Sequence, residues 1–377
     1  MKDRCFNVLR VMQINLNDKF GGVSSMIYNI YLNIDRDKVQ FDFVAPKTSS
    51  FHIFRDEIEK KGGNIFELNA TGILPIRKAK FIKRLYSHIK SHHYKVIHIN
   101  SGSIFFNIQC AWVAKICGIK KIIVHSHNAG TDSILREKMM KMARVLLEIF
   151  PTVYLACSEK AAEYMYVKWR ISGGEYTIIK NGIDVNKFRY CEKNREQYRK
   201  MLGIDDRLVL LHVGRFTLQK NHTCLIKIFA ECLKWNSRAV LLLVGEGELL
   251  EATKAEVEDL GLKDTVIFFG IRQDIPEIMS ASDVFLLPSL YEGLPVVGVE
   301  AQASGLPCVF SDTITREADI NEKNYFISNK DIQAWVEAIR KCSLQKNNRM
   351  ESADVISRKG YSLETIAKEL QEIYLSN

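Results

Sequence analysis

The sequence predicts an α/β protein built from two Rossmann-like domains that face a central cleft. Short apolar, β-branched segments alternate with longer amphipathic segments through most of its 377 residues. This alternation is typical of parallel sheets covered by helices on both faces. At least eleven segments can form strands, which is more than one sheet comfortably holds. A turn-rich segment, NGIDVNKF (181–188), marks the boundary between the domains. A (β/α)₈ barrel is the rival fold, but it needs eight regular units.

Each strand is predicted from a run of apolar residues that ends in a polar or glycine-containing turn. The predicted strands are 8–15, 39–45, 95–100, 120–126, 152–158, 176–181, 207–214, 239–245, 265–270, 283–289 and 307–312. Amphipathic periodicity predicts helices between them, for example over 23–34, 77–95 and 222–235, and a last helix over 360–377.

The composition is that of a globular protein, with 47% hydrophobic and 26% charged residues. No apolar stretch approaches the ~18–20 residues that span a bilayer. The first residues, MKDRCFNVLRVMQINL, are expected to form a strand and not a signal peptide. The nine cysteines include no C-x-x-C pair, so reduced thiols and a cytoplasmic protein are expected.

The positive charge is concentrated in the first half of the chain. Residues 1–185 carry 28 Lys and Arg against 16 Asp and Glu, whereas the remainder carries 25 against 28. This asymmetry favours an anionic partner such as membrane headgroups or a phosphorylated acceptor. Nucleic acid is not expected, because no binding module accompanies the charge. The basic segment 77–95 is either a core-facing helix with a solvated face or an interfacial helix on anionic lipid.

The segment SLYEGLPVVGVEAQASG (289–305) carries the strongest functional signal. Glu292 lies in a turn after a predicted strand, and Glu300 lies in the helix that follows. Such strand–turn–helix units bind ligands in α/β sheets, and the helix start suits a phosphate. Two carboxylates there can accept hydrogen bonds from hydroxyls, as on a ribose and a sugar, which indicates a nucleotide-sugar pocket. The alternative is a helix-capping Glu292 and a salt-bridged surface Glu300.

Two cations and several glycines complete this hypothesis. Arg215 ends a predicted strand and Lys220 lies in the next loop, where both can neutralise a diphosphate instead of being merely solvated. Gly21-Gly22 precede a predicted helix and allow close approach of a ligand. Neither this pair nor Gly245-Glu246-Gly247 extends to G-x-G-x-x-G, so NAD binding is not expected.

A histidine pair, His125-Ser126-His127, ends another predicted strand. Metal ligation is disfavoured, because no carboxylate or Cys lies at a supporting spacing. His125 is expected on the opposite side of the extended chain from His127, in a structural role.

Taken in order, these motifs have a specific spacing. They are Gly21-Gly22-Val23, His125-Ser126-His127-Asn128, Asn181-Gly182-Ile183-Asp184, Gly214-Arg215-Phe216, Lys220-Asn221, Gly245-Glu246-Gly247 and the pair Glu292 and Glu300. In them the chain resembles glycosyltransferase family 4 members of the GT-B fold, especially those that build bacterial capsular or exopolysaccharides. The resemblance implies an acceptor-side domain over 1–183, a donor-binding domain over 184–360, and a last helix, 361–377, that crosses back to the first domain.

The resemblance also implies roles for single residues. Arg215 and Lys220 would hold the leaving diphosphate, Glu292 would face the donor sugar, and Glu300 would accept hydrogen bonds from the ribose. His127 aligns with the family's active-site histidine, although a shift to His125 is possible. Further substrate-binding positions implied are Gly21, Gly22, Asn181, Gly214, Gly245, Glu246, Gly293 and Leu294.

The implied reaction is sugar transfer with retention of configuration, without a cofactor or an obligate metal ion. UDP is the expected nucleotide of the donor, and GDP is the second choice. The acceptor would be a glycan or a lipid-linked sugar. The expected location is the cytoplasm, with possible peripheral binding to the inner face of the cell membrane. Two alternative functions are a nucleotide-sugar epimerase of the same fold and a non-catalytic subunit that binds sugar nucleotides.

Overall fold

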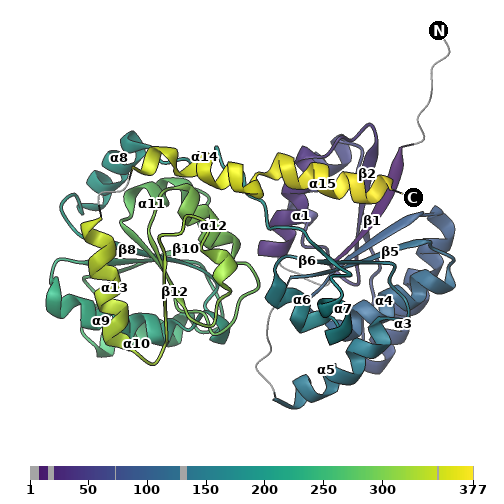
Figure 1. Cartoon of the computed structure of the whole chain (residues 1–377), viewed down its shortest axis with the longest axis horizontal. Helices are drawn as coiled ribbons and strands as arrows, with labels where there is room; N and C mark the ends of the chain where they lie inside the picture. Colours follow the sequence, from purple (N-terminus) through teal and green to yellow (C-terminus); the bar gives the residue numbers. More distant parts are fainter. Residues whose placement is uncertain (1–7, 16–20, 73, 128–133, 346–347, 377) are drawn as a thin grey trace, which may run out of the picture. The chain divides into compact units, whose positions relative to one another are not determined.

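The computed structural model describes residues 8–15, 21–72, 74–127, 134–345 and 348–376. The chain divides into two compact units, each with its own parallel sheet (Figure 1). Unit 1 comprises Met1–Gly182 and Leu363–Asn377, and unit 2 comprises Ile183–Ser362. Among the described residues, no helix combines the length and the apolar character needed to cross a bilayer.

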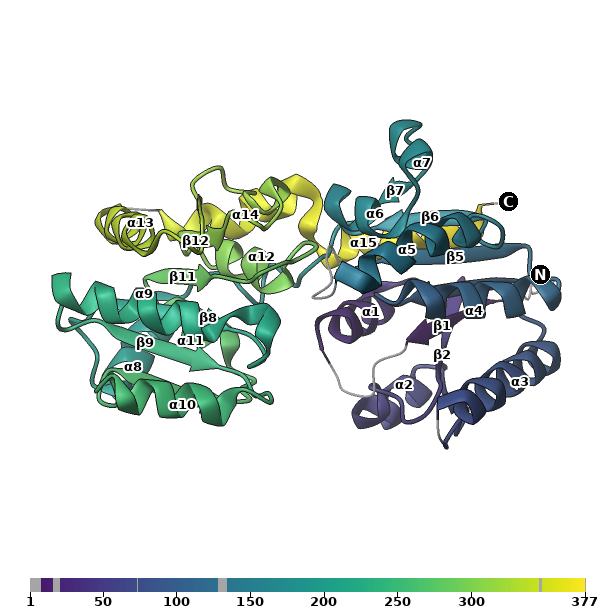
Figure 2. The ribbon, with the colours of Figure 1, turned by 90° about the horizontal axis from the view of Figure 1, so that it is seen from below.

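Unit 1 contains a seven-stranded sheet in the order β3-β2-β1-β4-β5-β6-β7. Its strands are β1 (Leu9–Asn15), β2 (Val39–Ala45), β3 (Asn64–Glu67), β4 (Val96–Asn100), β5 (Lys121–Ser126), β6 (Val153–Ala156) and β7 (Thr177–Ile178). Its helices are α1 (Gly22–Asn33), α2 (Arg55–Lys60), α3 (Leu74–His92), α4 (Ile104–Ile116), α5 (Ile134–Leu147), α6 (Glu159–Met165), α7 (Lys168–Ser172) and α15 (Leu363–Leu375). Helix α1 packs beside α15 on one face, while α3, α4 and α5 follow one another on the other (Figure 2).

Unit 2 contains a six-stranded sheet in the order β10-β9-β8-β11-β12-β13. Its strands are β8 (Val209–Val213), β9 (Val240–Val244), β10 (Val266–Gly270), β11 (Val284–Leu287), β12 (Cys308–Ser311) and β13 (Tyr325–Ile327). Its helices are α8 (Glu192–Leu202), α9 (His222–Trp235), α10 (Leu250–Asp259), α11 (Ile275–Ala281), α12 (Val296–Ala303), α13 (Ile332–Leu344) and α14 (Ser352–Ile356). Because β8, β9 and β11 are buried along their length, their residues form near-continuous apolar runs.

Helix α15 is part of the core of unit 1, although it lies at the end of the chain. Its apolar face contributes Ile366, Ala367, Leu370 and Tyr374 to the same buried cluster as β1 and β2. At its carboxyl end, the Lys121 ammonium donates hydrogen bonds to the backbone oxygens of residues 373 (2.8 Å), 374 and 376. A cation at this end also opposes the negative end of the helix dipole.

The parallel α/β architecture predicted from the sequence is confirmed, and two edge strands were missed. Strands β3 and β13 have only four and three residues, too short to give a periodic signal. The segment predicted as a strand over 176–181 pairs only at Thr177 and Ile178. The strand predicted over 283–289 ends at Leu287, because Pro288 has no N–H with which to continue the ladder.

Candidate functional site

The strand order of unit 2 reverses between β8 and β11, which are direct neighbours. In open α/β sheets, ligands bind at the carboxyl ends of the strands where the order reverses. Gly214 and Arg215 follow β8, and the loop after β11 carries Glu292. Two of the predicted motifs, about 75 residues apart in the sequence, therefore meet at the expected binding edge.

Lys220 and Glu292 form an ion pair across this edge. The Lys220 Nζ lies 2.6 Å from Glu292 Oε1, with side chains that are only 16% and 11% exposed. At such burial a lone charge is costly, whereas a hydrogen-bonded pair is tolerated. The alternative that Glu292 caps the following helix is not met, because α12 has no side-chain cap.

Backbone contacts hold the two loops of this pair together. The Gln219 side chain donates to the Tyr291 carbonyl (2.9 Å), and the Gln219 backbone carbonyl accepts from the Leu290 amide (2.8 Å). Asn221 adopts a left-handed conformation, with φ 55°, and donates to the Pro288 carbonyl (3.2 Å). The ion pair is thus mounted on a rigid frame rather than on a free loop.

Glycine is required where the loops after β8 and β9 touch. A Cβ on Gly245, whose φ is +139°, would lie 2.1 Å from the Gly214 carbonyl oxygen, and one on Gly247 would lie 2.4 Å from the Phe216 oxygen. A Cβ on Gly214 would press on the aliphatic part of Lys220 at 3.2 Å. These glycines let the two backbone segments 214–216 and 245–247 converge beside the Lys220 side chain.

Arg215 and Glu246 lie at the same edge with exposed side chains. Within the part of the chain that the structure describes, the Arg215 side chain makes no hydrogen bond or ion pair, unlike that of Lys220. The N–H groups of the Arg215 guanidinium are available as hydrogen-bond donors near Gly214 and Gly245. A planar guanidinium can bind two phosphate oxygens at once.

Glu300 lies on α12, downstream of the buried Gly293 and Leu294. Burial raises the pKa of Glu300 to about 7, and Lys187 opposes this shift in part. The carboxyl group is therefore held in a poorly solvated position, without the salt bridge expected for a surface glutamate. The alternative of a salt-bridged surface residue is therefore not met, and the ribose-binding role of Glu300 stays a prediction.

Two buried histidines beneath Lys220 were not singled out in the sequence. His212 donates from Nδ1 to the Leu286 carbonyl (2.9 Å), and His222 stacks on Phe216 with ring centroids 4.0 Å apart. Burial lowers the pKa of His222 to about 4 and that of His212 well below its usual value, and the nearby Lys220 adds to both shifts. A histidine inside the apolar run LLHVG was the available signal.

The strand order of unit 1 also reverses between two neighbours, β1 and β4. Their last residues, Asn15 and Asn100, pair in register. Gly21 is the N-cap of α1, and a Cβ on Gly21 or Gly22 would meet no atom within 4 Å. The packing among the described residues therefore leaves room for a side chain at both positions. The close approach of a ligand stays the predicted reason for the two glycines.

His127 lies one residue after β5 and is buried, with Nε2 3.2 Å from Asn100 Oδ1. Burial lowers its pKa to about 3, so the ring is neutral. The expectation that His125 lies on the opposite side of the strand is wrong, because residues i and i+2 share a face. The two rings are 4.0 Å apart. Asn128 lies outside the described residues.

Asn181 follows β7 and is buried in unit 1. The predicted site residues therefore form two groups, one on each unit.

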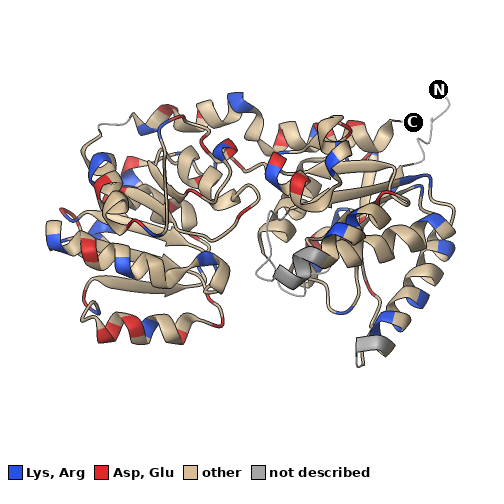
Figure 3. Cartoon of the chain, turned by 60° about the horizontal axis from the view of Figure 1, so that its bottom comes forward, with Lys and Arg blue, Asp and Glu red and all other residues tan. Residues whose placement is uncertain are grey.

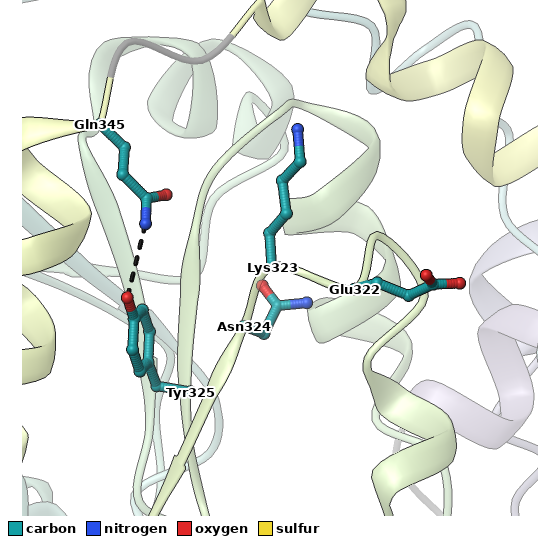
Figure 4. A pocket seen from close by; sticks show the side chains of 5 residues that line it. All are labelled: Glu322, Lys323, Asn324, Tyr325 and Gln345. Carbon is teal, nitrogen blue, oxygen red and sulfur yellow. Dashed lines mark hydrogen bonds between the residues drawn. The ribbon is translucent and has the colours of Figure 1, made fainter.

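Among the described residues, no cluster of three or more His, Cys, Asp or Glu side chains could hold a metal ion. A surface depression on unit 2 is lined by Glu322, Lys323, Asn324, Tyr325 and Gln345 and includes none of the predicted residues (Figure 4).

The comparisons with known proteins identify the family. Residues 20–187 match the family described as Glycosyltransferase Family 4, and residues 194–362 match Glycosyl transferases group 1. EpsF of Bacillus subtilis, which is named as a glycosyltransferase, is 30% identical over 373 residues, or 97% of this chain and 96% of the relative. The chain belongs to glycosyltransferase family 4.

Other relatives agree with this assignment. This glycosyltransferase is 28% identical over 316 residues to the Escherichia coli UDP-Gal:alpha-D-GlcNAc-diphosphoundecaprenol alpha-1,3-galactosyltransferase, covering 80% of each chain. The crystal structure of Anabaena HepE in complex with UDP-glucose superposes with a TM-score of 0.77 at 18% identity, covering 97% of this chain and 99% of that one. At this identity the likeness shows the fold alone, and it confirms the predicted GT-B fold.

We predict that Gly245→Ala destabilises unit 2 by about 2–4 kcal/mol, because the new methyl group collides with the Gly214 carbonyl. Gly261→Ala is the matched control: its φ is also positive, at +66°, but a Cβ there meets no atom within 4 Å. This control should cost about 1 kcal/mol. Urea unfolding measures both, and equal losses would contradict the proposed close approach.

Proposed function

We propose that this glycosyltransferase moves a sugar from a UDP-sugar to a lipid-linked or oligosaccharide acceptor, with retention of configuration, in bacterial surface polysaccharide biosynthesis. The observation that carries the proposal is the Lys220–Glu292 pair at the switch point of unit 2, beside the unpaired Arg215. Two comparisons support the donor and acceptor: a relative named for UDP-Gal and a diphosphoundecaprenol-linked acceptor, and a structural neighbour bound to UDP-glucose.

In this proposal, the donor rearranges the ion pair. Before binding, Glu292 neutralises Lys220 at 2.6 Å. A diphosphate supplies competing negative charge, so Lys220 and Arg215 turn to the phosphate oxygens. Glu292 is then released to accept hydrogen bonds from hydroxyls of the donor sugar, while Glu300 accepts from the ribose.

The transfer itself requires stabilisation of the departing diphosphate. As the bond between the anomeric carbon and the phosphate oxygen breaks, negative charge grows next to Arg215, Lys220 and the first-turn amides of α12. The acceptor oxygen attacks the same face of the oxocarbenium-like carbon, and its proton passes to the leaving phosphate. These cations supply the electrostatic stabilisation, so no divalent ion is required and no protein nucleophile is assigned.

On the acceptor side, the neutral His127 accepts a hydrogen bond from a sugar hydroxyl. Gly21 and Gly22 admit the ligand close to the backbone, and Asn181 contributes a polar side chain. Gly214, Gly245 and Glu246 border the diphosphate, and Gly293 and Leu294 border the donor sugar at the start of α12.

The decisive assay incubates the purified protein with radiolabelled UDP-glucose or UDP-galactose and a polyprenyl-diphosphate-linked sugar. We expect an α-linked product, formed at an undiminished rate in excess chelator.

Arg215→Ala should lower kcat by about 10²–10³-fold with little change in the free energy of unfolding, because the Arg215 side chain is exposed. Lys220→Ala should lower kcat as much, and should also destabilise the fold by leaving Glu292 buried and unpaired.

Lys254→Ala is the control for this assay, since it breaks the exposed Lys254–Glu251 pair of the same unit and should leave kcat unchanged. A β-linked product would contradict retention, and loss of turnover in chelator would contradict metal independence. Epimerised donor without acceptor would identify an epimerase instead. Binding of UDP-sugar without any turnover would leave the non-catalytic function.

The raised pKa of Glu300 predicts how donor affinity depends on pH. If the ribose hydroxyls bind the ionised carboxylate, binding below pH 7 must first remove a proton, so affinity falls as the pH drops. From pH 6 to pH 8 the dissociation constant should tighten about tenfold, for a pKa near 7. Calorimetry with UDP-glucose is suitable, because its diphosphate diester keeps its charge over this range.

Glu300→Gln is the control for the pH experiment, since the amide cannot ionise. Its dissociation constant should be nearly independent of pH from 6 to 8. The same pH dependence in wild type and Glu300→Gln would show that another group is responsible, and would remove Glu300 from the ribose site.

We also propose peripheral contact with anionic lipid at the inner face of the cell membrane. Figure 3 shows Lys and Arg along α3, where Lys78, Lys80 and Lys83 are exposed. The apolar stripe of this helix is not free to enter lipid, because Phe81, Leu85 and Ile89 are buried in unit 1. The contact made by α3 would therefore be electrostatic.

Exposed apolar side chains lie on the helices that follow α3. Trp112 and Ile116 of α4 are 41% and 51% exposed, and Met142 and Val145 of α5 are 77% and 61% exposed. Helix α4 packs against both α3 and α5, so basic and apolar side chains occupy neighbouring helices. This combination suits the boundary between headgroups and acyl chains.

Replacing Lys78, Lys80 and Lys83 with Glu should abolish sedimentation with vesicles that contain phosphatidylglycerol. Arg84 is left unchanged, because it donates to the Leu68 and Asn69 carbonyls at 2.5 and 2.6 Å. The control replaces Lys193, Lys200 and Lys227 of unit 2, which are also exposed, and has the same net charge. Equal binding of the two variants would contradict a specific role for α3.

A further inference from the structure

A continuous chain of hydrogen bonds connects the last helix to His127 inside unit 1. The His127 Nε2 lies 3.2 Å from Asn100 Oδ1, and Asn100 Nδ2 donates to Gln13 Oε1 at 2.9 Å. Gln13 Nε2 donates to the Tyr374 hydroxyl at 3.0 Å, and that hydroxyl lies 2.7 Å from His98 Nδ1. We call these five residues the amide relay.

Every member of the amide relay is buried and none carries a formal charge. Their side chains are at most 7% exposed, and they come from four elements, β1, β4, the end of β5 and α15. Burial lowers the pKa of both His98 and His127 to about 3, so both rings remain neutral at physiological pH. Buried networks of this kind hold one geometry, because a broken member leaves a neighbour unsatisfied.

The donor and acceptor inventory sets the proton positions in the relay. Asn100 Oδ1 can only accept, so the Nε2 of His127 must carry the proton. The Nδ1 of His127 then holds a lone pair, and among the described residues this buried atom has no hydrogen-bond partner. The Tyr374 hydroxyl accepts from Gln13 Nε2, and the tautomer of His98 decides which partner donates in the contact between that hydroxyl and His98 Nδ1.

We propose that Tyr374 is a positioning residue for His127: through Gln13 and Asn100 it fixes the ring orientation and the Nε2–H tautomer, and so presents Nδ1 as an acceptor for a substrate hydroxyl. The catalytic part of this inference rests on the proposed function, in which His127 contacts the sugar. The tautomer itself does not. A hydroxyl at the end of the chain thereby determines which hydrogen bond the site can offer.

The docking of α15 does not depend on the Tyr374 hydroxyl. The Tyr374 ring packs edge-on against Phe41 with centroids 5.8 Å apart, and Leu370 is buried beside it in the same cluster. Lys121 caps the end of the helix, and the Gln371 side chain accepts from the Asp35 amide at 3.0 Å. Tyr374→Phe thus removes the relay contact and keeps these anchors.

Nitrogen-15 NMR of the histidine-labelled full-length protein tests the tautomer directly, with His127→Ala used to assign the signal. In wild type at pH 7 we expect the shifts of a protonated Nε2 and a bare Nδ1. In Tyr374→Phe we expect these two shifts to move toward each other, as in a mixture of tautomers. Unchanged His127 shifts in Tyr374→Phe, or a bare Nε2 in wild type, would overturn the proposal.

Steady-state kinetics tests whether the tautomer matters for turnover. Tyr374→Phe should lower kcat about five- to tenfold while changing the KM for the donor less than about twofold, as for one lost buried hydrogen bond. Tyr166→Phe is the matched control: its hydroxyl is also buried and donates to the Val124 carbonyl at 2.8 Å, outside the relay. Equal losses of kcat in both variants would point to general packing and overturn the coupling.

A double-mutant cycle separates this inference from the proposed function. In the His127→Ala background, Tyr374→Phe should have no further effect on kcat, because the residue it positions is absent. An undiminished additional loss would overturn the relay as the route. If His127→Ala alone left kcat unchanged, the proposed role of His127 would fail, while the NMR result would still decide the relay.

Discussion

The geometry at the carboxyl edge of the unit 2 sheet in this glycosyltransferase depends on one ion pair, that of Lys220 with Glu292. Two charges with side chains mostly removed from water are stable only together, and removing one partner of such a pair costs about 3–5 kcal/mol. The pair therefore constrains the loops after β8 and β11 to meet. It also limits the ligand that can displace Glu292 from Lys220: the ligand must bring negative charge for the ammonium group and hydrogen-bond donors for the released carboxylate.

The surroundings of Lys220 concentrate positive charge on its ammonium and on Arg215. His212 and His222 lie beneath it, but burial and the ammonium itself lower their pKa values, so they stay neutral. The convergence of Gly214 and Gly245 brings backbone instead of side chains to this point. The result is a small cationic area at the carboxyl ends of buried strands, which suits the diphosphate of the proposed donor.

The sequence predicted the elements whose signal is local. The strands β8, β9 and β11 were predicted because burial on both faces gives a near-continuous apolar run, and the helix over 222–235 was predicted because burial of one stripe gives a helical period. The edge strands β3 and β13 were missed, since four and three residues show no period. The individual site residues Lys220 and Glu292 were predicted from motifs, but their direct contact was not, because 72 residues separate them. His125 was misplaced by an error of strand geometry, and His212 was hidden within an apolar run.

The amide relay could not be predicted either, because its members are even farther apart in the sequence. Gln13 and Tyr374 are 361 positions apart, and nothing in either segment marks the other as its partner. The Tyr374 ring completes the apolar cluster of β1 and β2, while its hydroxyl enters a network of neutral amides and imidazoles that ends at His127. The Tyr374 ring thus packs in the apolar core while its hydroxyl joins the hydrogen-bond network. The packing of the last helix is in this way connected to the geometry at the sheet edge. The hydrogen bonds of His127 therefore extend, through Asn100 and Gln13, to a helix that is distant from it in the sequence.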